Sequence, residues 1–343
     1  YVIDRFNHRV MKWTPGATVG TVVAGGNGGG GSALNQFYYP FYIDMDSSGN
    51  MYVTDTNNQR VMKWAPGAAE GTVVAGGNGI GSALNQFQTP LGIALDSSGN
   101  MYVADEYNHR VMKWAPGASE GTVVAGGNGD GSALNQLSHP YGIALDNLGN
   151  IYVIDSYNHR IMKWAPDASE GTVVAGGNGE GSANNQLHYP VGITLDSSGN
   201  IYIVGEIMSR VMKWEPGATE GKVVAGGNGR GSANNQLYYP WGIDLDSSEN
   251  IYIADRFNQR IQKVQIAPQI TIAAGETTGT ITFTGIEDDL NDEDDETIII
   301  NPSESINATN TFTDSKTVTL LNNSITVTRK DDPFIGLSKG SVS

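Results

Sequence analysis

Residues 90–139 read PLGIALDSSGNMYVADEYNHRVMKWAPGASEGTVVAGGNGDGSALNQLSH, and most of the chain repeats this stretch. The tryptophans fix the period, because Trp64, Trp114, Trp164 and Trp214 are each fifty residues apart, while Trp13 precedes Trp64 by fifty-one. The additional residue falls in the glycine run at 28–31, which places it in a loop. Self-similarity at this period is typical of a propeller or a solenoid.

One repeat has the sequence of four short strands. Residues 91–95 lead into DSSGN, which suits a hairpin turn, and residues 101–104 and 109–114 are rich in β-forming side chains. Pro116 and Gly117 interrupt the pattern before GTVVA at 121–125 predicts a fourth strand. No window has the 3.6-residue apolar period of a helix. Four antiparallel strands per repeat predict a propeller blade, because the coils of a β-solenoid are shorter.

The run GIALDSSGNMYVADEYNHRVMKW at 92–114 resembles the NHL repeat, whose pattern is a proline followed by G-I-x-x-D, G-N-x-Y-V-x-D and N-x-R. The N-H-R triplet recurs at 7–9, 108–110 and 158–160, and it reads N-Q-R at 58–60 and 258–260. The resemblance covers residues 1 to 265. It implies an all-β, six-bladed propeller.

Counting strands by this pattern predicts a ring with incomplete ends. Second strands are expected to begin at six positions, namely Tyr1, Met51, Met101, Ile151, Ile201 and Ile251. First strands of the GIALD type and fourth strands of the TVVAGG type each occur five times. Either the chain is a fragment whose first strand precedes Tyr1, or a segment of the tail or of another molecule fills the gap.

Composition excludes several classes of function. The 343 residues contain no cysteine, which removes disulfides, thiol nucleophiles and thiolate metal sites. The net charge of -16 argues against a nucleic-acid partner, because a phosphate backbone requires a basic face. No stretch is apolar enough for a membrane span, and no signal peptide precedes Tyr1, so we expect a mature or truncated chain. These features agree with an extracellular protein.

The repeat pattern ends near Lys263, and residues 266–343 form a second, acidic region with 13 acidic and 4 basic side chains. Its Thr- and Ile-rich segments predict a β-sandwich. The turn at Gly275, Glu276 and Thr277, the D-E-T at 295–297 and ITVTRKDD at 325–332 resemble the later strands of a Calx-beta domain. The earlier strands have no counterpart, so this resemblance implies a partial sandwich.

A partial sandwich exposes an apolar face and unpaired strand edges, which favour pairing with other chains. Residues 333–343 are short and nearly uncharged, as a donor strand would be. We therefore expect either the propeller or a strand from a neighbouring molecule to cover the sandwich, and the second arrangement would produce a homo-oligomer or fibre.

Clustered carboxylates in this region predict a candidate calcium site, since calcium takes six to eight oxygen ligands. The ligands would come from Glu287, Asp288, Asp289, Asp292, Asp294 and Asp295. The resemblance to Calx-beta domains implies calcium in some members. The alternative is a solvated acidic loop that protects a strand edge.

Other repeated residues are interpreted as structural. His8, His109 and His159 occupy one position of the turn where other repeats have Gln or Ser, which favours turn capping over metal binding. An Asp and an Arg recur at fixed spacing, as in Asp105 and Arg110, which predicts a charge-assisted hydrogen bond in each hairpin. The GGNGxGSA segments lack the helix and lysine of a phosphate loop and are interpreted as connectors between blades.

The fifth repeat departs from the pattern. It has Gly205 in place of the aspartate, and Ile207 and Met208 in a turn that is polar elsewhere. Departures from a consistent array mark places where a function or contact is located. We predict that Ile207 and Met208 form an interface with the tail or with a neighbouring subunit.

The favoured function is a secreted, non-enzymatic structural or adhesive subunit that self-associates. Faithfully copied blades are expected to present rings of the same side chain, whereas catalysis requires unlike groups at one point, so no catalytic residue or cofactor other than calcium is predicted. Two alternatives stay open: a propeller that binds a glycan or protein with its loops, and a lyase or hydrolase that acts at the central channel.

Overall fold

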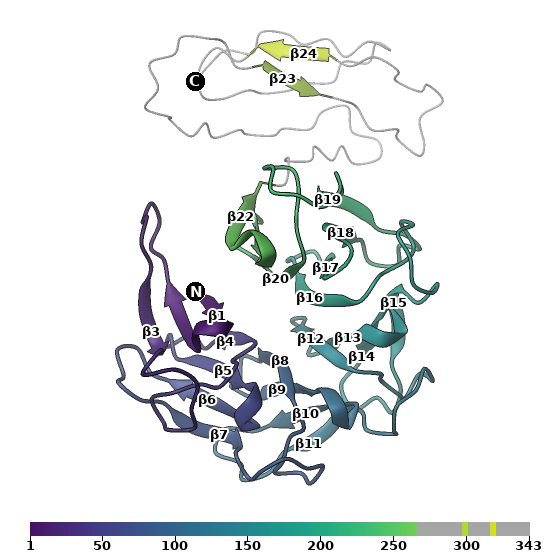
Figure 1. Ribbon diagram of the computed structural model, residues 1–343. Coiled ribbons are helices and arrows are strands. Elements are labelled where there is room, and N and C mark those ends of the chain that lie inside the picture. The colour runs from purple at the N-terminus through teal and green to yellow at the C-terminus, as the bar shows by residue number, and fades with distance from the viewer. Residues whose placement is uncertain (266–296, 301–315, 320–343) are drawn as a thin grey trace. The chain divides into compact units, whose positions relative to one another are not determined.

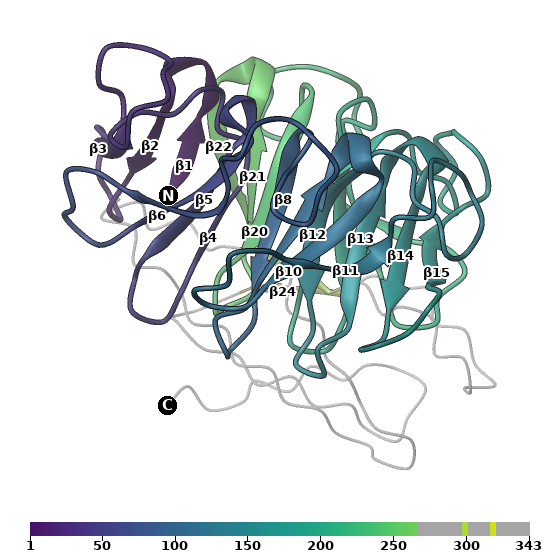
Figure 2. The ribbon, with the colours of Figure 1, turned by 90° about the horizontal axis from the view of Figure 1, so that it is seen from below.

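The computed structural model describes residues 1–265, 297–300 and 316–319 of the chain. Six antiparallel sheets stand around a common centre, which confirms the predicted six-bladed, all-β propeller and excludes the solenoid (Figure 1). Viewed at a right angle, the strands of successive sheets lie side by side (Figure 2). The first strands of neighbouring blades contact one another in succession around the centre.

Blades one to six are numbered here in chain order. Their strands are β1 (Val2–Asp4), β2 (Arg9–Lys12) and β3 (Thr21–Gly25); β4 (Ile43–Met45), β5 (Met51–Asp55), β6 (Arg60–Trp64) and β7 (Thr72–Gly76); β8 (Pro90–Leu95), β9 (Met101–Asp105), β10 (Arg110–Trp114) and β11 (Thr122–Gly126); β12 (Pro140–Leu145), β13 (Ile151–Asp155), β14 (Arg160–Trp164) and β15 (Thr172–Gly176); β16 (Pro190–Leu195), β17 (Ile201–Gly205), β18 (Arg210–Trp214) and β19 (Lys222–Gly226); and β20 (Pro240–Leu245), β21 (Ile251–Asp255) and β22 (Arg260–Val264).

Every blade has two ends that differ in their connections, as blade three illustrates. At one end Leu95 pairs with Met101, and Met101 pairs with Trp114, so the DSSGN hairpin and the Pro-Gly turn lie together. At the other end Asp105 pairs with both Pro90 and Arg110. This second end therefore gathers the turn between the second and third strands and the connector to the next blade.

The turn between the second and third strands is a single 3-10 turn in five blades. These turns are η1 (Arg5–Asn7), η2 (Thr56–Asn58), η3 (Glu106–Asn108), η4 (Ser156–Asn158) and η5 (Arg256–Asn258). Each ends at a residue with positive φ, such as His109 at 51°. No other helix is present among the described residues, in agreement with the absence of a helical period in the sequence.

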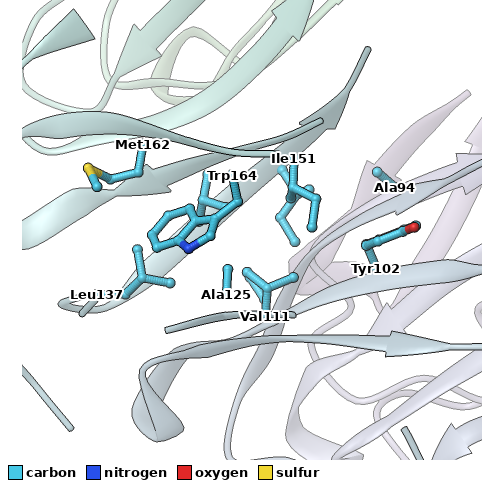
Figure 3. Close-up of a cluster of buried hydrophobic side chains, with 11 residues drawn as sticks. Ala94, Tyr102, Val111, Ala125, Leu137, Ile151, Met162 and Trp164 are labelled. Carbon is cyan, nitrogen blue, oxygen red and sulfur yellow. The ribbon is translucent and has the colours of Figure 1, made fainter. Parts of the chain in front are cut away.

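The apolar cores lie between blades. In the core between blades three and four, the Trp164 side chain packs with Leu137, Ala125 and Val111, and it is 1% exposed (Figure 3). Burial of such a side chain contributes about 2–3 kcal/mol, and the same tryptophan recurs in blades two to five. The near-identity of the repeats thus follows from one core being copied around the ring.

The junction between blades six and one differs from the others. Five core clusters join the described blades in sequence, from one and two to five and six, and none joins six to one. Blade one has no first strand and blade six has no fourth strand among the described residues, as the sequence predicts. Consequently Trp13 is 45% exposed, whereas the equivalent Trp64 is 1% exposed.

The chain divides into two units, Tyr1–Ile266 and Ala267–Ser343. In the second unit, β23 (Thr297–Ile300) pairs in antiparallel fashion with β24 (Lys316–Thr319). The rest of the predicted Calx-beta-like sandwich, the proposed donor strand and the candidate calcium ligands from Glu287 to Asp295 lie outside the described residues. Within the described part, no helix is long and apolar enough to cross a membrane.

Candidate functional site

The repeated Asp and Arg form the frame on which the candidate site is built. In blade three, buried Asp105 accepts hydrogen bonds from Arg110 Nε (2.8 Å), Asn108 Nδ2 (2.7 Å) and the Gln88 N–H (2.6 Å). The guanidinium also donates to the carbonyls of Ser82, Ala83 and Gln86 in the connector. The network thus ties the turn to the connector from the preceding blade, which confirms the structural interpretation of these charges.

The histidines of the turn cap the next blade. His109 Nδ1 accepts a hydrogen bond from the His139 N–H at 3.3 Å, and His159 Nδ1 accepts one from the Tyr189 N–H at 3.3 Å. Gln59 Oε1 does the same for Thr89 at 2.7 Å, which explains why Gln replaces His. Burial lowers the pKa of His109, in keeping with a neutral ring that accepts at Nδ1.

The connectors are held by their own side chains. Asn128 donates to the carbonyls of Gly126 and Asn135, and Gln136 donates back to the Asn128 carbonyl at 2.9 Å. A parallel bridge joins Asp130 to Leu137. These bonds use the polar groups of the loop within the loop itself, and they support its interpretation as a connector between blades.

The repeats differ from one another mainly at one end of the blades. The residue after the buried aspartate is Arg5, Thr56, Glu106, Ser156, Glu206 or Arg256. The next residue is Phe6, Asn57, Tyr107, Tyr157, Ile207 or Phe257. The residue after the blade-opening proline is Phe41, Leu91, Tyr141, Val191 or Trp241. We call these positions, together with the connector tips Ile80, Asp130, Glu180 and Arg230, the variable face.

The opposite end of the blades is nearly the same in every repeat. It carries the DSSGN and APGASEG turns, with few departures, of which Leu148 is the most exposed apolar one at 81%. We call this end the constant face. Sequence variation between the repeats is thus concentrated on the variable face.

Unlike side chains of the variable face converge at the centre of the ring. The Arg256 guanidinium lies 3.7 Å from the centroid of the Trp241 ring, and Arg256 Nη1 donates to Glu206 Oε1 at 3.4 Å. On the other side of Trp241, Phe41 stacks at a centroid distance of 5.2 Å, and the Arg5 guanidinium lies 4.8 Å from the Phe41 ring. We call this central group the hub.

Glu106 is the most perturbed acid of the hub. Its side chain is buried, and Oε1 lies 3.2 Å from His139 Nδ1. Burial raises the pKa of Glu106 to about 7, with the nearby Arg5 charge acting in the opposite direction. Burial also lowers the pKa of His139. Near neutral pH, Glu106 can therefore hold or release a proton.

Two donors at the hub have no hydrogen-bond acceptor among the described residues. They are Arg5 Nε and Trp241 Nε1, and both atoms are buried. Leaving a buried donor unpaired costs about 1–3 kcal/mol. The centre of the variable face thus has buried N–H donors that no described residue of the chain accepts from.

Around the hub, four aromatic side chains at one repeated position are exposed to solvent. The exposed fractions are 61% for Phe6, 50% for Tyr107, 52% for Tyr157 and 50% for Phe257. Tyr157 stacks on His139 at a centroid distance of 4.1 Å, which holds one ring face against the blade and leaves the other side of the ring outward. Exposed aromatic rings are enriched at recognition surfaces.

Blade five interrupts this pattern. Ile207 and Met208 are half-buried, and Met208 packs against the core between blades four and five. The contact of Met208 within the chain explains part of its apolar character. The role of Ile207 and Met208 in an interface with the tail or another subunit stays a prediction.

The expectation that every ring of equivalent residues would present the same side chain is wrong for the hub. It holds for the Asp and Arg frame outside blade five, but the residue after the aspartate position is Arg in two blades, Glu in two, and Thr or Ser in the others. Variation inside otherwise identical repeats was the signal that could have identified Arg5, Glu106 and Arg256. Among the described residues, no group of three or more His, Cys, Asp or Glu side chains is arranged to hold a metal ion.

Comparisons with known proteins agree with this architecture. Residues 87–114, 137–164 and 237–264 match the NHL repeat, and residues 181–208 match a related beta-propeller repeat. No curated protein sequence matches the chain.

Several solved structures share the fold. An auxiliary nutrient binding protein from Bacteroides thetaiotaomicron is 17% identical with a TM-score of 0.52, and the match covers 69% of this chain and 60% of that one. A chain of a nidogen/laminin complex is 21% identical with a TM-score of 0.51, covering 66% and 76%. A streptogramin B lyase is 12% identical with a TM-score of 0.44, covering 82% and 91%. The chain thus spans 60% of the length of the nutrient-binding protein, and it is a six-bladed β-propeller that carries NHL repeats.

Proposed function

We propose that the propeller is a non-enzymatic recognition module that binds a protein or glycan partner with its variable face. The observation that carries this proposal is the concentration of sequence variation at one end of otherwise copied blades. A scaffold that only fills space has no reason to vary more at one end than at the other, whereas a binding surface requires different groups at different places.

The chemistry of the variable face supports recognition. Its rim carries four half-exposed aromatic side chains, and its hub combines two arginines, two glutamates and the Trp241 ring. Aromatic and Arg side chains supply most of the binding energy in typical interfaces. Of the solved structures that share this fold, one is described as an auxiliary nutrient binding protein and another is a chain of a nidogen/laminin complex, and their likeness to this chain concerns the fold.

Self-association, secretion and fibre formation remain part of the proposal as predicted from the sequence. The edge of β22 is consistent with strand addition, because no described strand pairs with it, whereas the equivalent β10 pairs with β11. A partner bound to the variable face and a neighbour added at this edge would not compete for the same residues.

The test compares the two faces. The triple variant Tyr107→Ala/Tyr157→Ala/Phe257→Ala removes exposed rings of the variable face, and Leu148→Ala removes an exposed apolar side chain from the constant face. We expect a glycan array and a panel of extracellular-matrix proteins to yield a ligand whose affinity falls by about tenfold or more in the triple variant and not in Leu148→Ala. A ligand lost in both variants, or in neither, would contradict the assignment of the face.

Acid–base catalysis at the hub is a second candidate, favoured by Glu106 and its contact with His139. A carboxyl group with a pKa of about 7 is suited to proton transfer at neutral pH. If the hub is catalytic, Glu106→Gln abolishes turnover of a bound ligand while its affinity is retained. If the hub only binds, the ligand is recovered chemically unchanged from the wild-type protein.

A further inference from the structure

Blade five contains an open cavity beside its turn. Its volume is about 490 Å³, and its walls include Gly181, Ser182, His188, Met208, Ser209 and Arg210. Ligand sites of this kind typically measure about 300–1,000 Å³. The cavity lies at the turn of blade five, outside the hub.

The cavity arises where three side chains of the repeated network are missing. Gly205 stands where the other blades have the buried aspartate, Met208 stands where they have asparagine, and Ser209 stands where they have histidine or glutamine. In the other blades these side chains form the hydrogen bonds between turn and connector. Blade five keeps the arginine of the network but none of these three side chains.

Arg210 is therefore the one frame arginine without a carboxylate among the described blades. Its equivalents donate from Nε to an aspartate at 2.6–2.8 Å, whereas Arg210 makes one side-chain hydrogen bond, from Nη2 to the Ala183 carbonyl at 3.1 Å. The cavity lining includes a second cation, Arg230, whose guanidinium lies 4.7 Å from the centroid of the Tyr239 ring. The nearby Glu180 is paired with His188 at 2.6 Å.

Other polar groups of the cavity also lack partners within the described chain. Ser209 is 5% exposed, and its Oγ has no hydrogen-bond partner. The Gly181 carbonyl has no side-chain donor, whereas the equivalent Gly131 carbonyl accepts from Asn158 at 2.9 Å. The cavity thus offers the donors of Arg210, the acceptor of Gly181 and the hydroxyl of Ser209.

We propose that the blade-five cavity binds a carboxylate, which takes the place of the missing aspartate against Arg210. Arginine pairs well with carboxylates, and in the other blades the equivalent arginine donates from Nε to an aspartate. The free Gly181 carbonyl and the Ser209 hydroxyl suit a carboxylate that carries hydroxyl groups, such as a uronic acid. This site does not depend on binding at the hub.

The experiment is calorimetric titration of the purified chain with sodium acetate, sodium D-glucuronate and inorganic phosphate at constant ionic strength. We expect saturable binding of both carboxylates, with glucuronate tighter than acetate because it engages Gly181 and Ser209. Arg210→Gln should weaken both by about tenfold or more. Lys222→Ala, which removes an exposed cation of the same blade, should change neither.

A repaired blade provides the decisive variant. In Gly205→Asp/Met208→Asn the chain supplies its own carboxylate and amide, so acetate and glucuronate should no longer bind although the fold is retained by circular dichroism. Absence of saturable carboxylate binding to the wild type would overturn the proposal. Binding of phosphate alone, or carboxylate binding that survives both Arg210→Gln and the repair, would overturn it as well.

Discussion

Blades three and five have the same four-stranded sheet, but the equivalent arginine has different partners in the two blades. Arg110 is 6% exposed and forms an ion pair with Asp105, which is fully buried. Arg210 faces Gly205, and burial lowers the pKa of its guanidinium with no carboxylate to compensate. The comparison shows that the frame contact stabilises a blade without being required for its shape, so one copy is available for another use.

The largest expected effect separates these two arginines. Arg110→Ala leaves Asp105 buried without its cation and should lower the free energy of unfolding by about 3–5 kcal/mol. Arg210→Ala removes a partly exposed cation with one hydrogen bond and should lower it by about 1 kcal/mol. Urea denaturation followed by tryptophan fluorescence measures both. Equal losses would mean that the two blades do not differ in this contact.

A pH effect distinguishes the hub from the frame. Because burial raises the pKa of Glu106 from its ordinary 4.5 to about 7, the native state holds this proton more tightly than the unfolded chain does. The protonated Glu106 side chain therefore contributes to the free energy of unfolding in full below about pH 4.5, and this contribution, on the order of 3 kcal/mol, is lost as the pH rises through about 7. Glu106→Gln should flatten this part of the plot of unfolding free energy against pH, because glutamine does not titrate. His139 is present in both proteins, so the difference between them reports Glu106. Parallel profiles for the two proteins would contradict the raised pKa.

Repair of blade five should show coupling between two positions. A β-carbon at residue 205 would lie 2.7 Å from Met208 Sδ, so Gly205→Asp alone should destabilise the protein. Met208→Asn removes the contacts with the Met208 side chain, and the His188 carbonyl, 2.9 Å from the added β-carbon, must then shift slightly. The new carboxylate can then meet Arg210, so the two changes should couple favourably by about 1–2 kcal/mol in a double-mutant cycle. Strict additivity would indicate that blade five cannot adopt the arrangement of blade three.

The smallest effect concerns the rim. Tyr107, Tyr157 and Phe257 are half-exposed, so each alanine substitution should change the free energy of unfolding by no more than about 0.5 kcal/mol. Thermal denaturation checks this. A larger loss would show that these rings belong to the structural part of the blade and would weaken the functional comparison between the faces.

Much of the fold could be predicted from the sequence because one core is copied many times. The fifty-residue spacing of the tryptophans and the strand pattern were enough for six blades, two of them incomplete. The hub could not be predicted from one repeat, because Arg5, Phe41, Glu106 and Trp241 come from different blades and meet only when the ring forms. The blade-five departure was visible in the sequence, but a cavity beside Arg210 depends on what the neighbouring connector leaves open.

In the described ring, the junction between blades six and one is the only one without a shared apolar core. Cooperative units of a protein open first where few apolar contacts hold them. With Trp13 exposed and no shared core at this junction, opening should begin there and proceed blade by blade toward blades three and four. Amide protons of β2 and β22 should then exchange faster than those of β10 and β14. Protection against exchange should therefore increase with the distance of a blade from the junction between blades six and one.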